Sequence, residues 1–150
     1  MFISRAEIKD LNVIFELQKL CYEENALRYS DPNIPPLTQT INDIYDEFTG
    51  SLFLKCVLED KIVGSVRANE RDGTCYIGKL IVHPEYQNRG IGKKLMKEIE
   101  SVFEHIKRYE LFTGYKDDKN LYLYKKLGYR EFKSVQIKNN LFLIYLEKER

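Results

Sequence analysis

Several features are scarce in this chain, and each scarcity excludes a class of protein. The 150 residues contain no tryptophan, four prolines and three cysteines, and no apolar run long enough to cross a bilayer. A composition with 43% hydrophobic residues and little proline excludes a disordered or collagen-like chain. Because no apolar run is long enough to cross a bilayer, we expect no membrane-spanning segment. The N-terminus, Met-Phe-Ile-Ser-Arg-Ala-Glu, becomes charged too early for a signal peptide.

The number and spacing of the cysteines indicate the redox compartment of the protein. Cys21, Cys56 and Cys75 are odd in number, widely spaced and lack the CxxC pattern of a metal site. We interpret them as thiols in a reducing compartment, which predicts a cytoplasmic protein with no metal.

Excess charge of either sign is missing as well. The chain has 24 lysines and arginines against 23 acids, and its formal net charge is +1. A general nucleic-acid binder has a strong basic excess, so this function is not expected. The length predicts one domain over residues 1–150, with a core that buries about two-thirds of the unfolded surface.

Hydrophobic periodicity predicts four helices and six strands. Helices are expected at about 6–24, from an N-cap at Thr38 to Gly50, at 90–107 and at 119–127. The proline-rich segment 31–36 between the first two is expected to be a loop. Strands are expected at 51–58, 62–68, 74–82, 109–113, 129–136 and 141–147, with a turn at Asn139-Asn140. This order, ααβββαβαββ, predicts an α/β (α+β) fold with a mixed sheet and helices on both faces.

One loop has the properties of a phosphate cradle. The strand Leu80-Ile81-Val82 runs through His83-Pro84-Glu85-Tyr86 into Gln87-Asn88-Arg89-Gly90-Ile91-Gly92 and then directly into a helix. The first turn of a helix has unpaired N–H groups and a partial positive charge. Glycines there let the backbone approach an anion closely. A dinucleotide fingerprint needs a third glycine where Leu95 stands, and a P-loop needs Ser or Thr where Lys94 stands.

These residues resemble the GCN5-related N-acetyltransferase (GNAT) superfamily. Gln87–Gly92 matches its Q/R-x-x-G-x-G/A signature, and residues 120–129 are similar to its later helix, which ends in Tyr, a few residues, and Gly-Phe or Gly-Tyr. The order of elements agrees over nearly the whole chain. The resemblance implies a V-shaped split between the strand ending at Val82 and the strand at 109–113, with acetyl-CoA in the split.

The resemblance also implies residue roles. The backbone of the Leu80 strand would pair with pantetheine, and a bulge there would direct an N–H at the thioester oxygen. Tyr124 would protonate or hydrogen-bond the leaving thiolate, since a phenol pKa of about 10 is near a thiol pKa of about 8.5. The cofactor-binding residues implied are Leu80, Ile81, Val82, Gln87, Asn88, Arg89, Gly90, Ile91, Gly92, Lys93, Asn120 and Tyr124.

The catalytic base has no clear candidate. The strand before Leu80 reads Tyr76-Ile77-Gly78-Lys79 and lacks the glutamate that many members of the family have. Glu70 is our first candidate, Glu23 or Glu24 is a second, and an ordered water relay is a third.

The acceptor is expected to be a cationic amine bound by the first two helices and their loop. This region is rich in acids and tyrosines: Glu23, Glu24, Asp31, Asp43, Asp46 and Glu47, with Tyr22, Tyr29 and Tyr45.

The function expected is direct transfer of acetyl from acetyl-CoA to a primary amine of a small molecule or peptide. The missing strand glutamate leaves a non-catalytic acyl-CoA sensor as an alternative, and an interaction domain without activity is the third. Homodimers are common in the family, but the sequence assigns no interface.

Overall fold

The computed structural model describes residues 1–31, 33–139 and 141–150, and it contains one seven-stranded mixed sheet. Its strand order is β1-β2-β3-β4-β5-β7-β6. The strands are β1 (Phe2–Arg5), β2 (Leu52–Leu58), β3 (Lys61–Arg71), β4 (Thr74–Val82), β5 (Arg108–Gly114), β6 (Arg130–Lys138) and β7 (Leu141–Glu149). All neighbouring strands pair antiparallel except β4 and β5, which are parallel. The mixed α/β fold expected from the sequence is confirmed.

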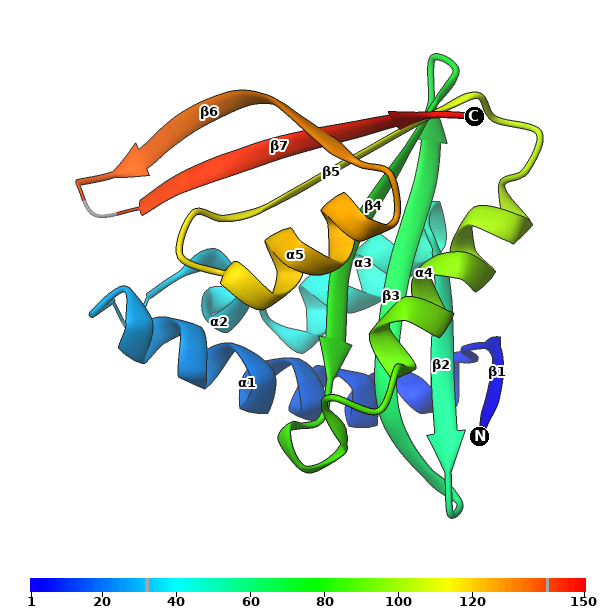
Figure 1. Ribbon diagram of the computed structural model, residues 1–150. Coiled ribbons are helices and arrows are strands. Elements are labelled where there is room, and N and C mark those ends of the chain that lie inside the picture. Colours follow the sequence, from blue (N-terminus) through cyan, green and yellow to red (C-terminus); the bar gives the residue numbers. More distant parts are fainter. Residues whose placement is uncertain (32, 140) are drawn as a thin grey trace.

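Helices cover both faces of this sheet (Figure 1). They are α1 (Leu11–Arg28), α2 (Pro35–Thr38), α3 (Ile41–Gly50), α4 (Ile91–Val102) and α5 (Asp118–Lys126), with short 3₁₀ turns at Ile8–Asp10 and Pro84–Tyr86. One core joins the sheet to α4 and α5, and Leu95, Met96 and Ile99 are buried in it. A smaller core joins α1 and α3 to Phe53 on the opposite face.

Tight turns fix the register of the central hairpins. Glu59 and Asp60 have φ of 53° and 64°, and Asp72 and Gly73 have φ of 50° and 82°. Two successive residues with positive φ form the type I′ turn, whose twist matches antiparallel strands. The strands expected at 51–58, 62–68 and 74–82 are therefore found with small changes at their ends.

The sheet opens between β4 and β5. These strands pair only from Thr74 opposite Arg108 to Tyr76 opposite Glu110. Beyond that point β5 turns away with β7, and β4 continues along β3 (Figure 1). The C-terminal half of β4 therefore keeps one edge without a strand partner. The V-shaped split expected between these two strands is confirmed.

A bulge interrupts β4 inside this free half. Ser65 of β3 faces Ile81 and Arg67 faces Gly78, so Val66 alone stands opposite Lys79 and Leu80. Lys79 has a φ of 52°, in the left-handed region that few non-glycine residues occupy. A β4 bulge was expected from the family resemblance, and the structure locates it at Lys79-Leu80.

The sequence-based expectation missed β1 and placed the starts of two helices wrongly. Four residues at a chain end are too few for periodicity, but β1 pairs with β2 from Phe2 opposite Val57. The helix expected at 6–24 is Leu11–Arg28, which follows a 3₁₀ turn at Ile8–Asp10. Thr38 is not an N-cap, because it is the last residue of α2. The cap of α3 is Thr40, whose Oγ1 accepts from the amide of Asp43 at 3.2 Å while Asp43 accepts from the amide of Thr40 at 2.8 Å.

The loop expected at 31–36 is also partly wrong. Pro35 and Pro36 occupy the first turn of α2, where no N–H is needed. Pro32 lies outside the described residues, as does Asn140 of the expected turn.

The helix expected at 90–107 ends early, at Val102. The phenol of Tyr109 donates to the carbonyl of Phe103 at 2.8 Å, so this carbonyl beyond the helix end is satisfied by β5. Within the described residues, no helix is both long and apolar enough to cross a membrane.

Candidate functional site

Two adjoining cavities occupy the opening between β4 and β5. The cradle cavity, of about 510 Å³, lies between the end of β4, the start of α4 and the loop before α5. The inner cavity, of about 360 Å³, lies between α1, α2, β3, β4, β5 and β7. Tyr22, Asn25, Leu80, Asp117 and Asn120 line both of them. The two cavities therefore adjoin along these five residues.

Backbone amides form the floor of the cradle cavity. Gly90 caps α4 with a φ of 81°, and the amide of Lys94 donates to its carbonyl at 3.1 Å. This is the first hydrogen bond of the helix, so the amides of Ile91, Gly92 and Lys93 precede it and have no helical acceptor. No atom lies within 4 Å of the place where a Cβ on Gly90 would stand. The loop is thus open to an anion, as its sequence predicts.

The end of β4 contributes its free edge. The carbonyl of Val82 accepts from Nε2 of Gln87 at 3.1 Å and from Sγ of Cys21 at 3.3 Å. Both donors come from outside the sheet, so this carbonyl is turned away from β3. Because peptide groups two residues apart point the same way in a regular strand, we expect the amide of Leu80 to face this side too. Burial raises the pKa of the Cys21 thiol to about 12, so the thiol stays a neutral donor.

Lysines add positive charge to the cradle cavity. Lys93 follows the glycine loop, Lys116 comes from the segment between β5 and α5, and Lys119 lies in the first turn of α5. Sequence reasoning found Lys93 but missed the other two. No motif connects them to the glycine loop, because only the topology brings the start of α5 opposite the start of α4.

Most of the expected cofactor-binding residues meet in this cavity. Ten of them line it: Leu80, Ile81, Val82, Gln87, Asn88, Gly90, Ile91, Gly92, Lys93 and Asn120. Arg89 is absent from the lining. Its guanidinium stacks on Tyr86, 5.0 Å from the ring centroid, and donates to the carbonyl of Glu85 at 3.5 Å. Tyr124 lines the inner cavity instead.

Tyr124 is 5% exposed and lies one helical turn after Asn120. Burial raises the pKa of this phenol far above its usual value, with smaller contributions from Tyr22 and Asp117. The near match to a thiol expected from the ordinary phenol pKa therefore does not hold in this structure. A phenol that keeps its proton is a hydrogen-bond donor throughout the physiological pH range.

At one wall of the inner cavity, the backbone of Gly114 approaches the side chain of Tyr29 closely. A Cβ at Gly114 would stand 2.1 Å from the phenol oxygen of Tyr29, so only glycine fits here. That phenol accepts from the amide of Lys116 at 2.9 Å, and burial raises its pKa to about 12. The contact fixes the C-terminal end of α1 against the end of β5.

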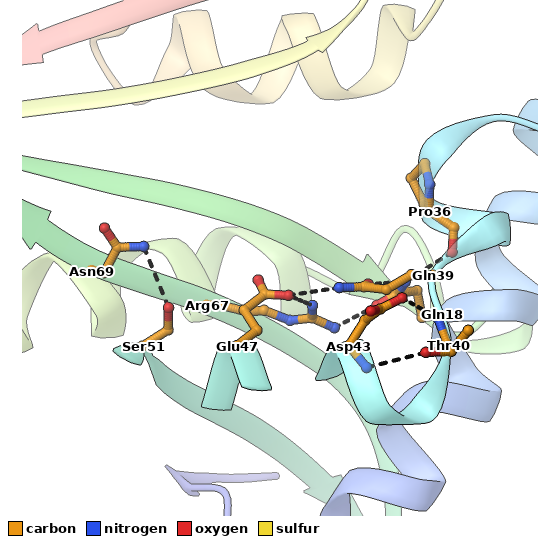
Figure 2. A network of polar contacts seen from close by, with 9 residues as sticks. All are labelled: Gln18, Pro36, Gln39, Thr40, Asp43, Glu47, Ser51, Arg67 and Asn69. Carbon is orange, nitrogen blue, oxygen red and sulfur yellow. Dashed lines mark hydrogen bonds and ion pairs between the residues drawn. The ribbon is translucent and has the colours of Figure 1, made fainter. Parts of the chain in front are cut away.

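A buried polar network forms the opposite wall (Figure 2). Arg67 of β3 is 2% exposed and pairs through Nη1 with Glu47 of α3 at 2.9 Å. Its Nη2 donates to Gln18 of α1, and Gln39 donates to Glu47 at 2.8 Å. The guanidinium also stacks on Phe53, 4.5 Å from the centroid. Sequence reasoning missed Arg67 and Gln18, because a single arginine in an apolar strand forms no motif.

The candidate bases lie in different places. Glu70 is exposed near the end of β3, where its carboxylate lies 3.4 Å from Nε2 of His105, and it lines neither the cradle nor the inner cavity. Glu23 is exposed and also lines neither cavity, whereas Glu24 lines the cradle cavity. The structure therefore does not bring Glu70 together with Tyr124.

The acids expected to bind a cationic acceptor are mostly elsewhere. Asp31 binds Lys138 at 2.9 Å, Asp43 caps α3, and Asp46 is exposed. Of this group only Glu47 lines the inner cavity, where it is paired with Arg67. Tyr22 and Tyr29 do line it.

Comparison with known proteins identifies the family. The model of the acetyltransferase (GNAT) family matches residues 11–129, so the chain belongs to this family. The match includes the glycine loop, the β4 bulge and the helix that carries Tyr124.

Solved structures have the same fold. A PaiA N-acetyltransferase from Thermoplasma acidophilum, in complex with coenzyme A, is 20% identical with a TM-score of 0.81, covering 100% of both chains. The ribosomal-protein-S18-alanine N-acetyltransferase of Escherichia coli is 15% identical with a TM-score of 0.80, covering 99% of this chain and 92% of that one. An IAA acetyltransferase from Bacillus cereus is 22% identical with a TM-score of 0.74, covering 99% of both.

Proposed function

We propose that this protein transfers the acetyl group of acetyl-CoA directly to a primary amine of a small molecule or peptide. The observation that carries the proposal is that the two cavities adjoin, with Leu80 and Asn120 in the lining of both. One cavity presents backbone amides and lysines to an anion, and the other presents a buried phenol.

The residues present fit acetyl-CoA. The amides of Ile91, Gly92 and Lys93 and the side chains of Lys93, Lys116 and Lys119 would hold its phosphates. The free edge of β4 would pair with the amides of its pantetheine arm, as an added strand does. The side chain of Asn120 would bond the same arm where the cavities join. When bound, acetyl-CoA supplies an activated acetyl thioester.

The chain's own groups would then promote acyl transfer. The amide of Leu80, freed by the bulge, would donate to the oxygen on which negative charge develops. The phenol of Tyr124 would donate a hydrogen bond to the departing sulfur and keep its proton, because burial raises its pKa far above that of a thiol. The inner cavity would hold the acceptor amine and exclude bulk water. Because Glu70 lines neither cavity, it has no role in this proposal.

A test needs both binding and turnover. Calorimetry with acetyl-CoA should give a saturable one-to-one titration. Mixing enzyme and acetyl-CoA with amino acids, polyamines, aminoglycosides and N-terminal peptides should release free CoA with at least one of them. Tight binding without CoA release from any acceptor would favour the acyl-CoA sensor, and absence of binding would refute the proposal.

A further inference from the structure

The formal charges that line the inner cavity sum to zero, but both carboxylates among them already have partners. Besides tyrosines, four acidic or basic side chains line it: Glu47, Arg67, Lys79 and Asp117. Each carboxylate already has partners. Glu47 binds Arg67 and Gln39 as described above, so its charge and that of Arg67 offset each other.

Asp117 is also fully engaged. Its Oδ1 pairs with Nη1 of Arg28 at 2.7 Å. Its Oδ2 accepts from Oγ1 of Thr113 and from the amide of Gly114, each at 3.1 Å. Three donors on one buried carboxylate leave it little capacity for a substrate cation.

Lys79 is the charge that remains. It is half-buried, it lines the inner cavity, and it has neither an ion pair nor a side-chain hydrogen bond with any residue in 1–31, 33–139 and 141–150. Burial lowers the pKa of its ammonium, Glu47 opposes this shift and Arg67 adds to it. One further donor is close by, because the buried Nε of Arg67 has no hydrogen-bond partner among the described residues, although the charge of Arg67 is paired with Glu47. A partly buried charge without a partner is costly, which indicates a ligand that supplies one.

The position of Lys79 connects this charge to the reaction. It is the bulge residue directly before Leu80, whose amide is proposed to face the thioester. Its left-handed backbone is strained, and such strain is retained mainly at functional sites. The rest of the cavity is largely apolar, with Tyr22, Tyr29, Ile34, Phe112, Leu141 and Leu143 in its lining.

We propose that the acceptor is an amine that also carries a carboxylate, with an apolar side chain, and that Lys79 binds this carboxylate. A single unpaired cation matches a monoanion, whereas a dianionic phosphate would leave negative charge in an apolar cavity. A purely cationic acceptor such as a polyamine would meet a like charge at Lys79. The inference rests on the proposed function, because it concerns the acceptor of that reaction.

The experiment compares acceptors that differ only in the carboxylate. CoA release is measured with phenylalanine, leucine and methionine and with the amide of each. We expect the wild-type enzyme to favour each amino acid over its amide at least tenfold in kcat/KM. Lys79→Met should raise KM for the amino acids about tenfold with little change in kcat, leave KM for the amides unchanged, and leave the Kd of CoA unchanged. Lys79→Arg should restore most of the preference.

Lys61→Met is the matched control, because Lys61 is an exposed lysine at the start of β3 that lines neither cavity. The inference is overturned if the amides or neutral amines are preferred, or if Lys79→Met raises KM equally for both members of a pair. If neutral amines or polyamines release CoA and amino acids do not, the proposed function stands and this inference fails. If no acceptor releases CoA, both fail.

Discussion

The two cavities of this protein differ in how far backbone groups and side chains contribute to their linings. The cradle cavity takes about half of its lining from residues 80–93, where helix α4 begins with backbone amides that have no helical acceptor. The inner cavity takes side chains from nine helices and strands, including Arg67 of β3, Tyr124 of α5 and Leu143 of β7. A backbone site depends on glycine and on local conformation, whereas a side-chain site can be rebuilt one residue at a time. This difference suits a shared donor on one side and a particular acceptor on the other.

The largest effect should come from the phenol of Tyr124 in the inner cavity. Tyr124→Phe removes one hydroxyl that lies in the inner cavity, so kcat should fall about 10³-fold while the Kd of CoA stays the same. This loss corresponds to about 4 kcal/mol of barrier. Single-turnover CoA release and calorimetry measure the two quantities separately.

Tyr122→Phe is the control for this change, since Tyr122 belongs to the same helix, is 63% exposed and lines neither cavity. Equal losses in the two variants would remove the distinction between donor and acceptor sides, because a general effect on α5 would then explain both.

The sequence predicted the residues of the cradle cavity well and those of the inner cavity poorly. The glycine loop, the strand before it and Asn120 form local patterns, so ten expected residues lie together in the cradle cavity. Arg67 and Glu47 are 20 positions apart and meet only because α3 packs against β3. Lys79 was passed over as the place where a glutamate is missing. Its proposed role depends on its having no ion pair or side-chain hydrogen bond among the described residues, which no sequence pattern reports.

The same reasoning explains the errors in the fold. The turns at Asp60 and Gly73 have local signals, and the strands beside them were predicted correctly. Strand β1 is stabilised by pairing with β2 rather than by its own sequence, and its Phe2 is 66% exposed. The end of α4 is set by a contact with Tyr109, which lies six residues beyond the accepting carbonyl.

The stability of the inner wall provides the next test. Glu47→Ala leaves the buried Arg67 without its counter-charge, which should lower the free energy of unfolding by about 3 kcal/mol. For a chain of this length, Tm should fall by roughly 9 °C. In the double variant with Arg67→Met, most of this loss should be recovered, because no unpaired charge remains.

Asp46→Ala is the control, because Asp46 is an exposed residue of the same helix. Its free energy of unfolding should differ from that of the wild-type protein by less than about 0.5 kcal/mol. If Glu47→Ala proves as mild as Asp46→Ala in thermal melts, the network in Figure 2 contributes little to the wall.

A backbone effect of intermediate size is expected in the cradle cavity. Gly90 and Gly73 have nearly the same φ, 81° and 82°, and each has open space where a Cβ would stand. Replacing either by alanine should cost about 1 kcal/mol of stability, because a Cβ disfavours the left-handed region. Only Gly90→Ala should also weaken CoA binding, by about tenfold, since its strain displaces the amides that follow.

Calorimetry on the two alanine variants separates the common cost from the specific one. An unchanged Kd for CoA in Gly90→Ala, with the expected loss of stability, would mean that the loop amides do not hold the cofactor.

The smallest effect should come from the ion pair on the boundary between the cavities. Arg28 lines the cradle cavity, and Asp117, which lines both, keeps the hydroxyl of Thr113 and the amide of Gly114 when Arg28 is replaced. Because the Arg28 side chain is 36% exposed, Arg28→Ala should cost at most about 1 kcal/mol of stability, and less at high salt. The pair joins α1 to the start of α5, so its loss should raise KM for acetyl-CoA and for the acceptor by similar, small factors of about two. Arg130→Ala, an exposed change on β6, should alter neither. A rise confined to one of the two KM values would assign Arg28 and Asp117 to that cavity alone and sharpen the boundary between donor and acceptor sides.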